Sequence, residues 1–161
     1  GHCIPIDPFY LTYIARKYDY HTRLIELAGE INNSMPDYVV ERLMKLLNAH
    51  KKCLNGSKII LVGLAYKSDI SDLRESPALD VLRILEENGA IVDIVDPYIG
   101  QFEWRSAKRK TSELTRDLIT NSDAVIITTA HMKNVNYELI VDNATLILDT
   151  TSVLRTLSLD S

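Results

Sequence analysis

A change of hydrophobic period near residue 58 constrains the fold of this chain more than any other feature. From that point on, short apolar runs alternate with stretches that have the spacing of amphipathic helices. The run at residues 59–62 is continuously apolar, as expected for a parallel strand covered on both faces. Further strands are predicted at residues 91–95, 124–128 and 145–148. Strands that alternate with helices imply a parallel sheet with right-handed crossovers, so we predict a Rossmann-like α/β domain.

Local signals place the helices between these strands. Ser76 precedes Pro77, which is a favourable helix start with serine as the N-cap, and Gly89 is positioned to end that helix. Shorter helices are predicted at residues 113–121 and 136–141. The polar stretch that precedes them extends to about Thr111. It contains one basic cluster, which we interpret as a solvated loop: Arg105, Lys108, Arg109 and Lys110.

The first third of the chain has helical spacing instead. A short helix is predicted around residues 9–14, followed by a long helix at about residues 23–54. Pro36 either kinks the long helix or starts a new one, in which case Ser34 is close enough to cap it. Asn55 and Gly56 are expected to end the helical region. We therefore divide the chain into a helical segment, residues 1–55, and a Rossmann-like domain, residues 56–161.

The composition is that of an ordinary globular protein. The chain has 161 residues, of which 46% are hydrophobic and 25% charged, and its net charge is −4. This charge argues against a nucleic-acid surface, which is usually basic. No apolar run approaches the ~20 residues that a membrane helix needs, and no signal peptide opens the chain. Neither nucleic acid nor a membrane is expected as a partner.

The cysteine and histidine positions suggest neither a disulfide nor a metal site. Cys3 and Cys53 form no disulfide framework and no CxxC motif, which predicts a reducing, cytoplasmic setting. His2 and His21 do not have the spacing of a common zinc site, so no metal is expected. Cys53 is expected to be a small buried hydrophobic residue. The remaining histidines, His50 and His131, are expected on loops or at the surface.

The loop after the first predicted strand lacks the dinucleotide fingerprint GxGxxG. It has the sequence GLAYK at residues 63–67, with one glycine and a lysine. A pyrophosphate cannot approach this backbone easily, so the domain is not expected to be the main dinucleotide site. Lys67 and Arg74 still fall at the usual ligand position of such sheets, where cations suit phosphate groups. Alternatively, they pair with neighbouring acidic residues: Asp69, Asp72 or Glu75.

Several segments, in this order, resemble the UDP-glucose/GDP-mannose dehydrogenase family. They are GHCIPIDP at residues 1–8, EIN at 30–32, GLAYK at 63–67 with DLRES at 72–76, and DPY at 96–98. The form of the first segment is similar to the branch that acts on UDP-N-acetylhexosamines. Residues 149–152, Asp-Thr-Thr-Ser, depart from the family's frequent Asp-Thr-Arg-Asn, which puts any role of that arginine in doubt. The chain opens at Gly1 without an initiator methionine, so we expect that an upstream segment has been removed.

The resemblance implies NAD-dependent oxidation of a sugar C6 alcohol to a carboxylate in two hydride transfers. Cys3 would be the nucleophile that forms a thiohemiacetal and then a thioester, which water hydrolyses. Asp7 would assist the water or the proton transfers, and Asn32 would lie near the reacting end. Lys67 would hold the UDP-sugar substrate and Arg74 would reach NAD, which the missing N-terminal domain would mainly bind. Without the resemblance, residues 32–34 (Asn-Asn-Ser) are equally compatible with a helix break.

Two hypotheses follow. The chain is a C-terminal fragment of a nucleotide-sugar 6-dehydrogenase, inactive alone because it lacks the main NAD domain. Alternatively, it is a non-catalytic module for nucleotide-sugar binding or oligomerisation. In the family the long helix forms a dimer core, so the resemblance also implies a homodimer with partly exposed apolar helix faces in this chain.

Overall fold

A four-stranded parallel sheet forms the centre of the computed structural model, which describes residues 6–157. Its strands are β1 (Lys58–Val62), β2 (Ile91–Val95), β5 (Ala124–Ile127) and β6 (Ile147–Asp149), in the order β2-β1-β5-β6. The central strand β1 pairs in parallel with β2 and β5, so that Ile60 lies opposite Asp93 and Val125. Helices connect the strands, which confirms the predicted Rossmann-like α/β domain.

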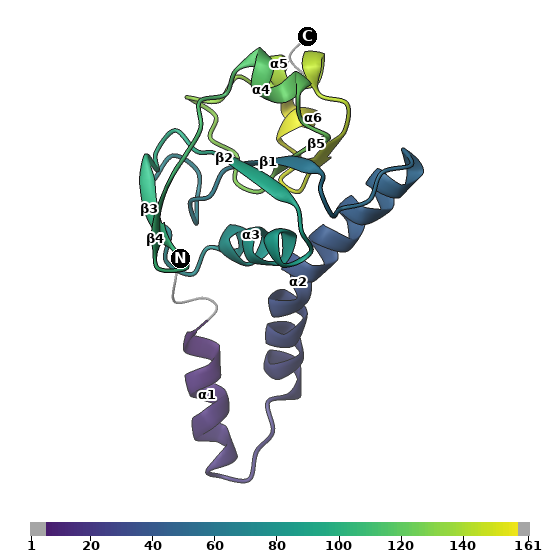
Figure 1. Cartoon of the computed structure of the whole chain (residues 1–161). Coiled ribbons are helices and arrows are strands. Elements are labelled where there is room, and N and C mark those ends of the chain that lie inside the picture. The colour runs from purple at the N-terminus through teal and green to yellow at the C-terminus, as the bar shows by residue number, and fades with distance from the viewer. Residues whose placement is uncertain (1–5, 158–161) are drawn as a thin grey trace.

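Helices cover both faces of this sheet, so β1 is buried on both sides. α3 (Pro77–Glu87) and the second half of α2 (Arg23–Ala49) lie on one face, and α4 (Arg116–Thr120) and α5 (Tyr137–Asn143) lie on the other (Figure 1). Successive side chains of β1 point to opposite faces. Ile59 and Leu61 therefore join the core beneath α3, whereas Ile60 joins the core beneath α4 and α5. The chain's last described helix is α6 (Val153–Leu157).

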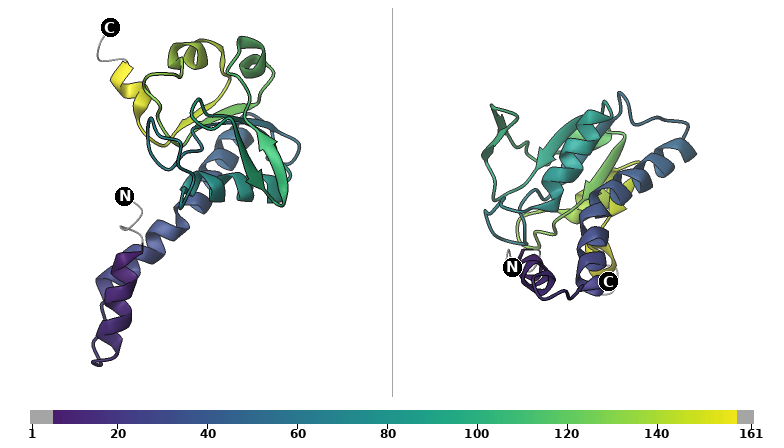
Figure 2. Two further views of the ribbon diagram at one scale, coloured as in Figure 1. Left: turned by 90° about the vertical axis from the view of Figure 1, so that its left-hand side faces the viewer. Right: turned by 90° about the horizontal axis from the view of Figure 1, so that it is seen from below.

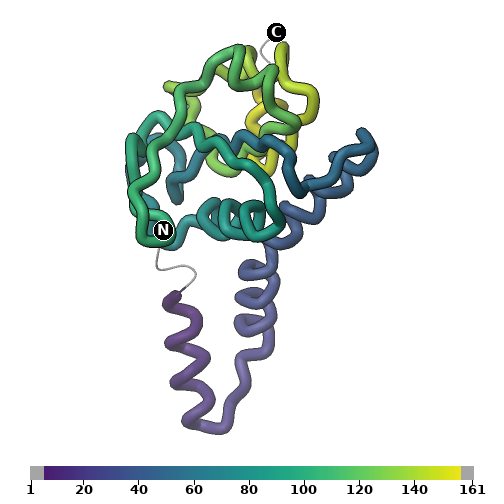
Figure 3. The backbone as a smooth tube through the Cα atoms, in the orientation of Figure 1, coloured from purple at the N-terminus to yellow at the C-terminus, as the bar shows by residue number. Residues whose placement is uncertain are grey.

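An antiparallel helical arm projects from this domain. α1 (Asp7–Arg16) runs back along the first half of α2, and the left view in Figure 2 shows the pair extending away from the sheet. The second half of α2 packs into the domain core through Val40, Leu43 and Leu47. The tube in Figure 3 follows α2 as one path from the arm into the domain. The long helix thus connects the two parts of the chain physically.

The long helix decides between the alternatives predicted at Pro36 and ends earlier than expected. It continues through Pro36, so this proline does not start a new helix, and the Ser34 hydroxyl donates to the Ile31 carbonyl within the helix instead of capping one. Residues 32–34 are helical, so the helix-break alternative is wrong. The helix also ends at Ala49, five residues before Leu54, because Lys51 has a left-handed φ of 58° that helical geometry does not allow.

A two-stranded hairpin replaces the solvated loop that the basic cluster predicted. β3 (Gln101–Trp104) pairs antiparallel with β4 (Ala107–Lys110). The Arg109 guanidinium donates to the Glu86 carboxylate on α3 and to the Val92 carbonyl on β2, so it is half-buried rather than solvated. The Trp104 indole N–H also donates to Glu86, at 2.8 Å. These contacts fix the hairpin against the edge of the domain.

Within residues 6–157, no helix has the length and apolar character needed to cross a membrane. The arm carries many exposed apolar side chains, but these are interrupted by polar ones on both helices.

Candidate functional site

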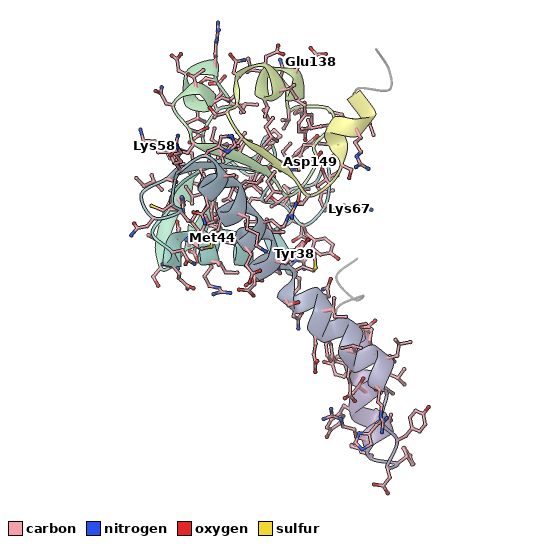
Figure 4. All side chains as sticks on the ribbon, turned by 90° about the vertical axis from the view of Figure 1, so that its right-hand side faces the viewer. Tyr38, Met44, Lys58, Lys67, Glu138 and Asp149 are labelled. Carbon is pink, nitrogen blue, oxygen red and sulfur yellow. The ribbon has the colours of Figure 1, made fainter. Side chains whose placement is uncertain are left out.

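The carboxyl edge of the sheet has the topology of a ligand site. From β1 the chain moves to β2 on one side and later to β5 on the other, so the crossover direction reverses between β1 and β5. Ligands of open α/β sheets bind at such a switch point, beyond the carboxyl ends of the strands. Figure 4 shows Lys58, at the amino end of β1, and Lys67, in the loop beyond its carboxyl end, on opposite sides of the domain.

A buried carboxylate organises this edge. The Asp96 side chain directly follows β2 and is inaccessible to solvent. Its Oδ2 atom accepts from the backbone N–H groups of Leu64 (2.7 Å) and Ala65 (2.9 Å), and its Oδ1 atom accepts from those of Tyr98 (2.9 Å) and Ile99 (3.2 Å). Burial by itself would raise the pKa of Asp96, but the hydrogen bonds, the strongest from His131, lower it below its ordinary value. Asp96 therefore stays ionised and joins the loops after β1 and β2.

His131 lies in the loop between β5 and α5, one of its two predicted places, but it is fully buried and not at the surface. Its Nε2 atom lies 3.1 Å from Asp96 Oδ2, and its Nδ1 atom lies 3.0 Å from the backbone nitrogen of Asp69. The Asp69 N–H can only donate, so Nδ1 is the acceptor and Nε2 carries the proton that Asp96 accepts. His50, by contrast, is exposed at the end of α2, as expected.

The loop after β1 is packed too tightly, and used too fully, to hold a dinucleotide pyrophosphate. Gly63 has φ 86°, and a Cβ atom there would lie 2.1 Å from the Thr129 carbonyl oxygen. The next two N–H groups, of Leu64 and Ala65, already donate to Asp96. α3 begins only at Pro77, so its N-terminus does not follow the strand directly. The residues present do not fit NAD in the manner of a GxGxxG loop.

The end of this loop has an unusual backbone. Glu75 has φ 57° and Asp69 has φ 61°, values that are rare for residues with a Cβ atom. Ser76 occupies the N-cap position as predicted, but its side chain caps nothing. Its hydroxyl instead donates to the Leu64 carbonyl at 2.8 Å, which ties the end of the loop to its start. The loop is therefore held in one conformation by the Ser76–Leu64 hydrogen bond within it and by the hydrogen bonds to Asp96 outside it.

A cleft of about 980 Å³ separates the arm from this loop and from α3. Asn32 lines it from α2, together with Pro8 and Phe9 from α1. Across the cleft lie Tyr66 and Glu75, the neighbours of Lys67 and Arg74. The carbonyl of Asn32 also lacks its usual helical donor, because residue 36 is a proline without an N–H group.

The structure brings most of the predicted site residues to the border of this cleft. Asp7 is exposed at the start of α1, directly before cleft-lining Pro8, and Asn32 lines the cleft itself. Lys67 and Arg74 are adjacent to lining residues but do not line the cleft. Cys3 lies outside the described residues.

The two cations of the loop differ in their partners. Arg74 forms a two-pronged pair with Asp72, with Nη2 at 2.7 Å from Oδ2 and Nε at 3.1 Å from Oδ1. The hydrogen bond with Asp72 raises the pKa of Arg74 still further. Lys67 is exposed, and no ion pair joins its side chain to another residue in the range 6–157. The acidic-partner alternative is thus confirmed for Arg74, whereas Lys67 remains available for a ligand.

Two further predicted features can be placed. Cys53 is exposed, which corrects its predicted burial, and its thiol lies 3.3 Å from the Asn55 carbonyl oxygen. In the segment that departs from the family pattern, Asp149 ends β6 and Thr151 follows it at the same carboxyl edge, where the Thr151 hydroxyl donates to Asp149 at 2.8 Å. Across residues 6–157, no group of three or more His, Cys, Asp or Glu side chains is arranged to hold a metal ion.

Known proteins match both parts of the chain. The sequence model of the UDP-glucose/GDP-mannose dehydrogenase family, UDP binding domain, matches residues 60–156, and that of the family's central domain matches residues 1–34. The chain is 36% identical over 99 residues to UDP-N-acetyl-D-glucosamine 6-dehydrogenase of Pseudomonas aeruginosa, covering 62% of this chain and 24% of that protein. It is 34% identical over 134 residues to UDP-N-acetyl-D-mannosamine dehydrogenase of Campylobacter jejuni, covering 81% of this chain and 31% of that protein.

A solved structure agrees with these matches. UDP-D-ManNAc dehydrogenase from Pyrococcus horikoshii superposes with a TM-score of 0.75 at 31% identity, over 92% of this chain and 34% of that chain. NDP-N-acetyl-D-galactosaminuronic acid dehydrogenase from Methanosarcina mazei, with a TM-score of 0.74 at 21% identity, shares the fold. The chain thus spans only 24% and 31% of the two sequence relatives named above.

Proposed function

Because the chain belongs to the UDP-glucose/GDP-mannose dehydrogenase family, we propose that it is the C-terminal part of an NAD-dependent UDP-sugar 6-dehydrogenase. The substrate we propose is a UDP-N-acetylhexosamine, because the relatives named above act on UDP-N-acetylglucosamine or UDP-N-acetylmannosamine. The observation that carries the proposal is Lys67, which has no ion pair within residues 6–157, at the switch point of a domain that matches the family's UDP-binding model. Residues 1–55 then form the central segment and residues 56–161 the UDP-sugar-binding domain.

The proposed chemistry divides between the two parts. Cys3 supplies the thiolate that adds to the C6 aldehyde, and Asp7 assists the proton transfers. Asn32 contacts the reacting end from the wall of the cleft. Lys67 binds the UDP phosphates as a point charge. Arg74 reaches the cofactor only if it leaves Asp72 or uses the donors that Asp72 does not occupy.

NAD itself is assigned to a part of the protein outside this chain. The support is the loop after β1, whose first two N–H groups after Gly63 are already bonded to Asp96. This chain alone should therefore oxidise no sugar. The reducing, cytoplasmic setting stays a prediction from cysteine usage.

The catalytic proposal is tested in the longer protein by substituting the two cysteines of this chain. Cys3→Ala is expected to abolish conversion of UDP-N-acetylhexosamine to the uronate, because the variant lacks the thiol proposed to form the covalent adduct. Cys53→Ala is the matched control, since that thiol is exposed beyond the end of α2. Uronate formation at the unsubstituted rate by Cys3→Ala would refute the proposed nucleophile.

The second candidate is a non-catalytic nucleotide-sugar-binding module. It is favoured because the N–H groups of Leu64 and Ala65, which a dinucleotide pyrophosphate would need, already donate to Asp96. Both functions predict that calorimetry detects UDP-N-acetylglucosamine or UDP-N-acetylmannosamine binding to this chain, and no NAD binding. Lys67→Ala should weaken this binding on the order of tenfold, as expected for one charge-assisted hydrogen bond. Lys58→Ala, at the opposite end of β1, should leave it unchanged. The module function alone predicts that the longer protein converts no UDP-sugar.

A homodimer through the helical arm is also proposed. Leu24, Leu27, Ile31, Met35 and Tyr38 recur at helical spacing on α2, and each is exposed. Phe9 of α1 contacts α2 at Gly29 instead, so this stripe faces away from α1. An apolar stripe of this length is covered in most proteins. A second copy of the chain would cover it symmetrically.

A further inference from the structure

The segment that carries Lys67 is held at both ends by one pair of buried side chains. At its start, Leu64 and Ala65 donate their N–H groups to Asp96. At its end, the Asp69 N–H donates to His131 Nδ1, and His131 Nε2 donates to the same Asp96 oxygen. Lys67 lies between these two points. Its backbone position therefore depends on residues beyond β2 and β5, and not on its own neighbours alone.

The Asp69 end of this segment needs such support. Asp69 has φ 61°, a left-handed conformation that is unfavourable for a residue with a Cβ atom. Besides the bond to His131, its carboxylate accepts from the Tyr98 hydroxyl at 3.1 Å. The Tyr98 ring lies against the His131 ring, with the centroids 5.0 Å apart. Without the Nδ1 acceptor, the Asp69 N–H would lose this hydrogen bond, and the strained turn would keep the Tyr98 contact and the backbone hydrogen bond that spans it, from the Tyr66 N–H to the Asp72 carbonyl at 2.7 Å.

His131 is itself fixed in place. The side chain has no solvent exposure, and its backbone N–H donates to the buried Tyr137 hydroxyl at 2.9 Å. Both ring nitrogens have partners, so the ring cannot turn over without placing a ring C–H group against the Asp69 N–H and losing both hydrogen bonds. A side chain in this position cannot touch a ligand, but it can set the shape of the loop that does.

We propose that His131 is a positioning residue for nucleotide binding, acting through its Nδ1 atom on the loop that carries Lys67. The proposal rests on the proposed function for the ligand, UDP-sugar. Loss of the Nδ1 contact, in which Nδ1 accepts a hydrogen bond from the Asp69 N–H, should weaken nucleotide affinity more than loss of the Nε2 contact with Asp96. A purely structural histidine would need both nitrogens equally.

Two amide substitutions separate the nitrogens. In His131→Asn the side-chain oxygen can take the place of Nδ1 and still accept from Asp69. In His131→Gln the longer amide can take the place of Nε2 and still donate to Asp96. Each variant loses one buried hydrogen bond, so comparable decreases in Tm are expected. Binding of UDP to this chain is measured by calorimetry, and exchange of the Asp69 amide hydrogen by NMR in the absence of nucleotide.

We expect His131→Asn to bind UDP within about threefold of the unsubstituted chain and His131→Gln about tenfold more weakly, ~1.4 kcal/mol. The Asp69 amide should exchange faster only in His131→Gln. Equal UDP affinities, or equal Asp69 exchange, in the two variants would overturn the proposal. An unsubstituted chain that binds no UDP would refute the proposed nucleotide site, while the exchange result would still decide the role of His131.

A third variant covers the case in which His131→Gln does not fold. Tyr98→Phe removes only the hydroxyl that donates to the Asp69 carboxylate and accepts from Asn134. If the turn at Asp69 sets the affinity, this variant should bind UDP about threefold more weakly, with faster Asp69 exchange. Unchanged affinity and unchanged exchange in Tyr98→Phe would count against control of Lys67 through this turn.

Discussion

Replacing Asp96 with asparagine tests the buried network most severely, because every lone pair of this carboxylate faces a donor. An asparagine must place its NH₂ group at one of the two oxygen positions. At Oδ2 it would oppose Leu64, Ala65 and His131 Nε2. At Oδ1 it would oppose only the backbone N–H groups of Tyr98 and Ile99. The second orientation leaves fewer donors unpaired, so the asparagine should adopt it, and it determines the loss of stability.

Two N–H groups would then lose a charged acceptor in a buried environment. At roughly 1–3 kcal/mol for each unsatisfied group, the expected loss in the free energy of unfolding is about 2–6 kcal/mol. A change of His131 tautomer cannot relieve the other orientation, because Nδ1 already accepts from Asp69. Such a loss would be a large fraction of the ~5–15 kcal/mol that stabilises a typical domain.

Urea unfolding followed by circular dichroism measures this loss. Asp93→Asn is the matched control, because Asp93 is half-buried on the same strand and its contact with the Ser112 hydroxyl is long, at 3.4 Å. The control should lose less than about 1 kcal/mol. An Asp96→Asn chain that unfolds within 1 kcal/mol of the unsubstituted one, with the same slope, would refute the account of Asp96 as an ionised acceptor.

Three further predictions follow from the fold. Gly63→Ala should unfold at least about 3 kcal/mol more easily in urea, since its Cβ would overlap the backbone across the switch point at φ 86°; a loss under 1 kcal/mol would contradict that packing. Burial raises the pKa of Asp96, but its hydrogen bonds lower that pKa below the ordinary value, and the hydrogen bond from Lys52 lowers the pKa of Asp123. The stabilisation that these two ionised carboxylates give the fold is complete above their unfolded-state pKa, near 4, and is lost as the pH falls through their lower folded-state pKa values. The urea concentration at the unfolding midpoint should therefore decrease between pH 5 and 2 but not between pH 8 and 5. Leu27→Ser with Ile31→Ser should shift sedimentation from dimer to monomer, whereas a clean monomer of the unsubstituted chain at high concentration would contradict the arm interface.

The sequence predicted the sheet because the sheet is buried. Residues 59–62 are apolar without interruption, and all lie in one of the two cores. The β3–β4 hairpin was missed for the opposite reason. Its strands are polar apart from Phe102 and Trp104, and it is held by Arg109, whose partner Glu86 lies on another element. Local pattern carries no signal for a contact of that kind.

The site divides in the same way. Lys67, Asn32 and Asp7 could be singled out from motifs, and the fold places them along the cleft border. His131 could not be singled out from the sequence, because its burial depends on its partner Asp96, which lies 35 residues earlier in the chain. An aspartate directly after a buried strand was the one available signal, and the sequence offered it only as part of the family resemblance, without a role or a partner.

The most direct test of the central claim is an NMR titration of this chain with UDP, read residue by residue. The claim is that the carboxyl edge at the β1–β5 switch point binds the nucleotide. Chemical-shift changes should therefore concentrate in residues 64–75 and 128–134 and saturate together, with the arm residues 9–31 little affected. Saturable binding whose shifts lie elsewhere, or no shift at millimolar UDP, would contradict the claim.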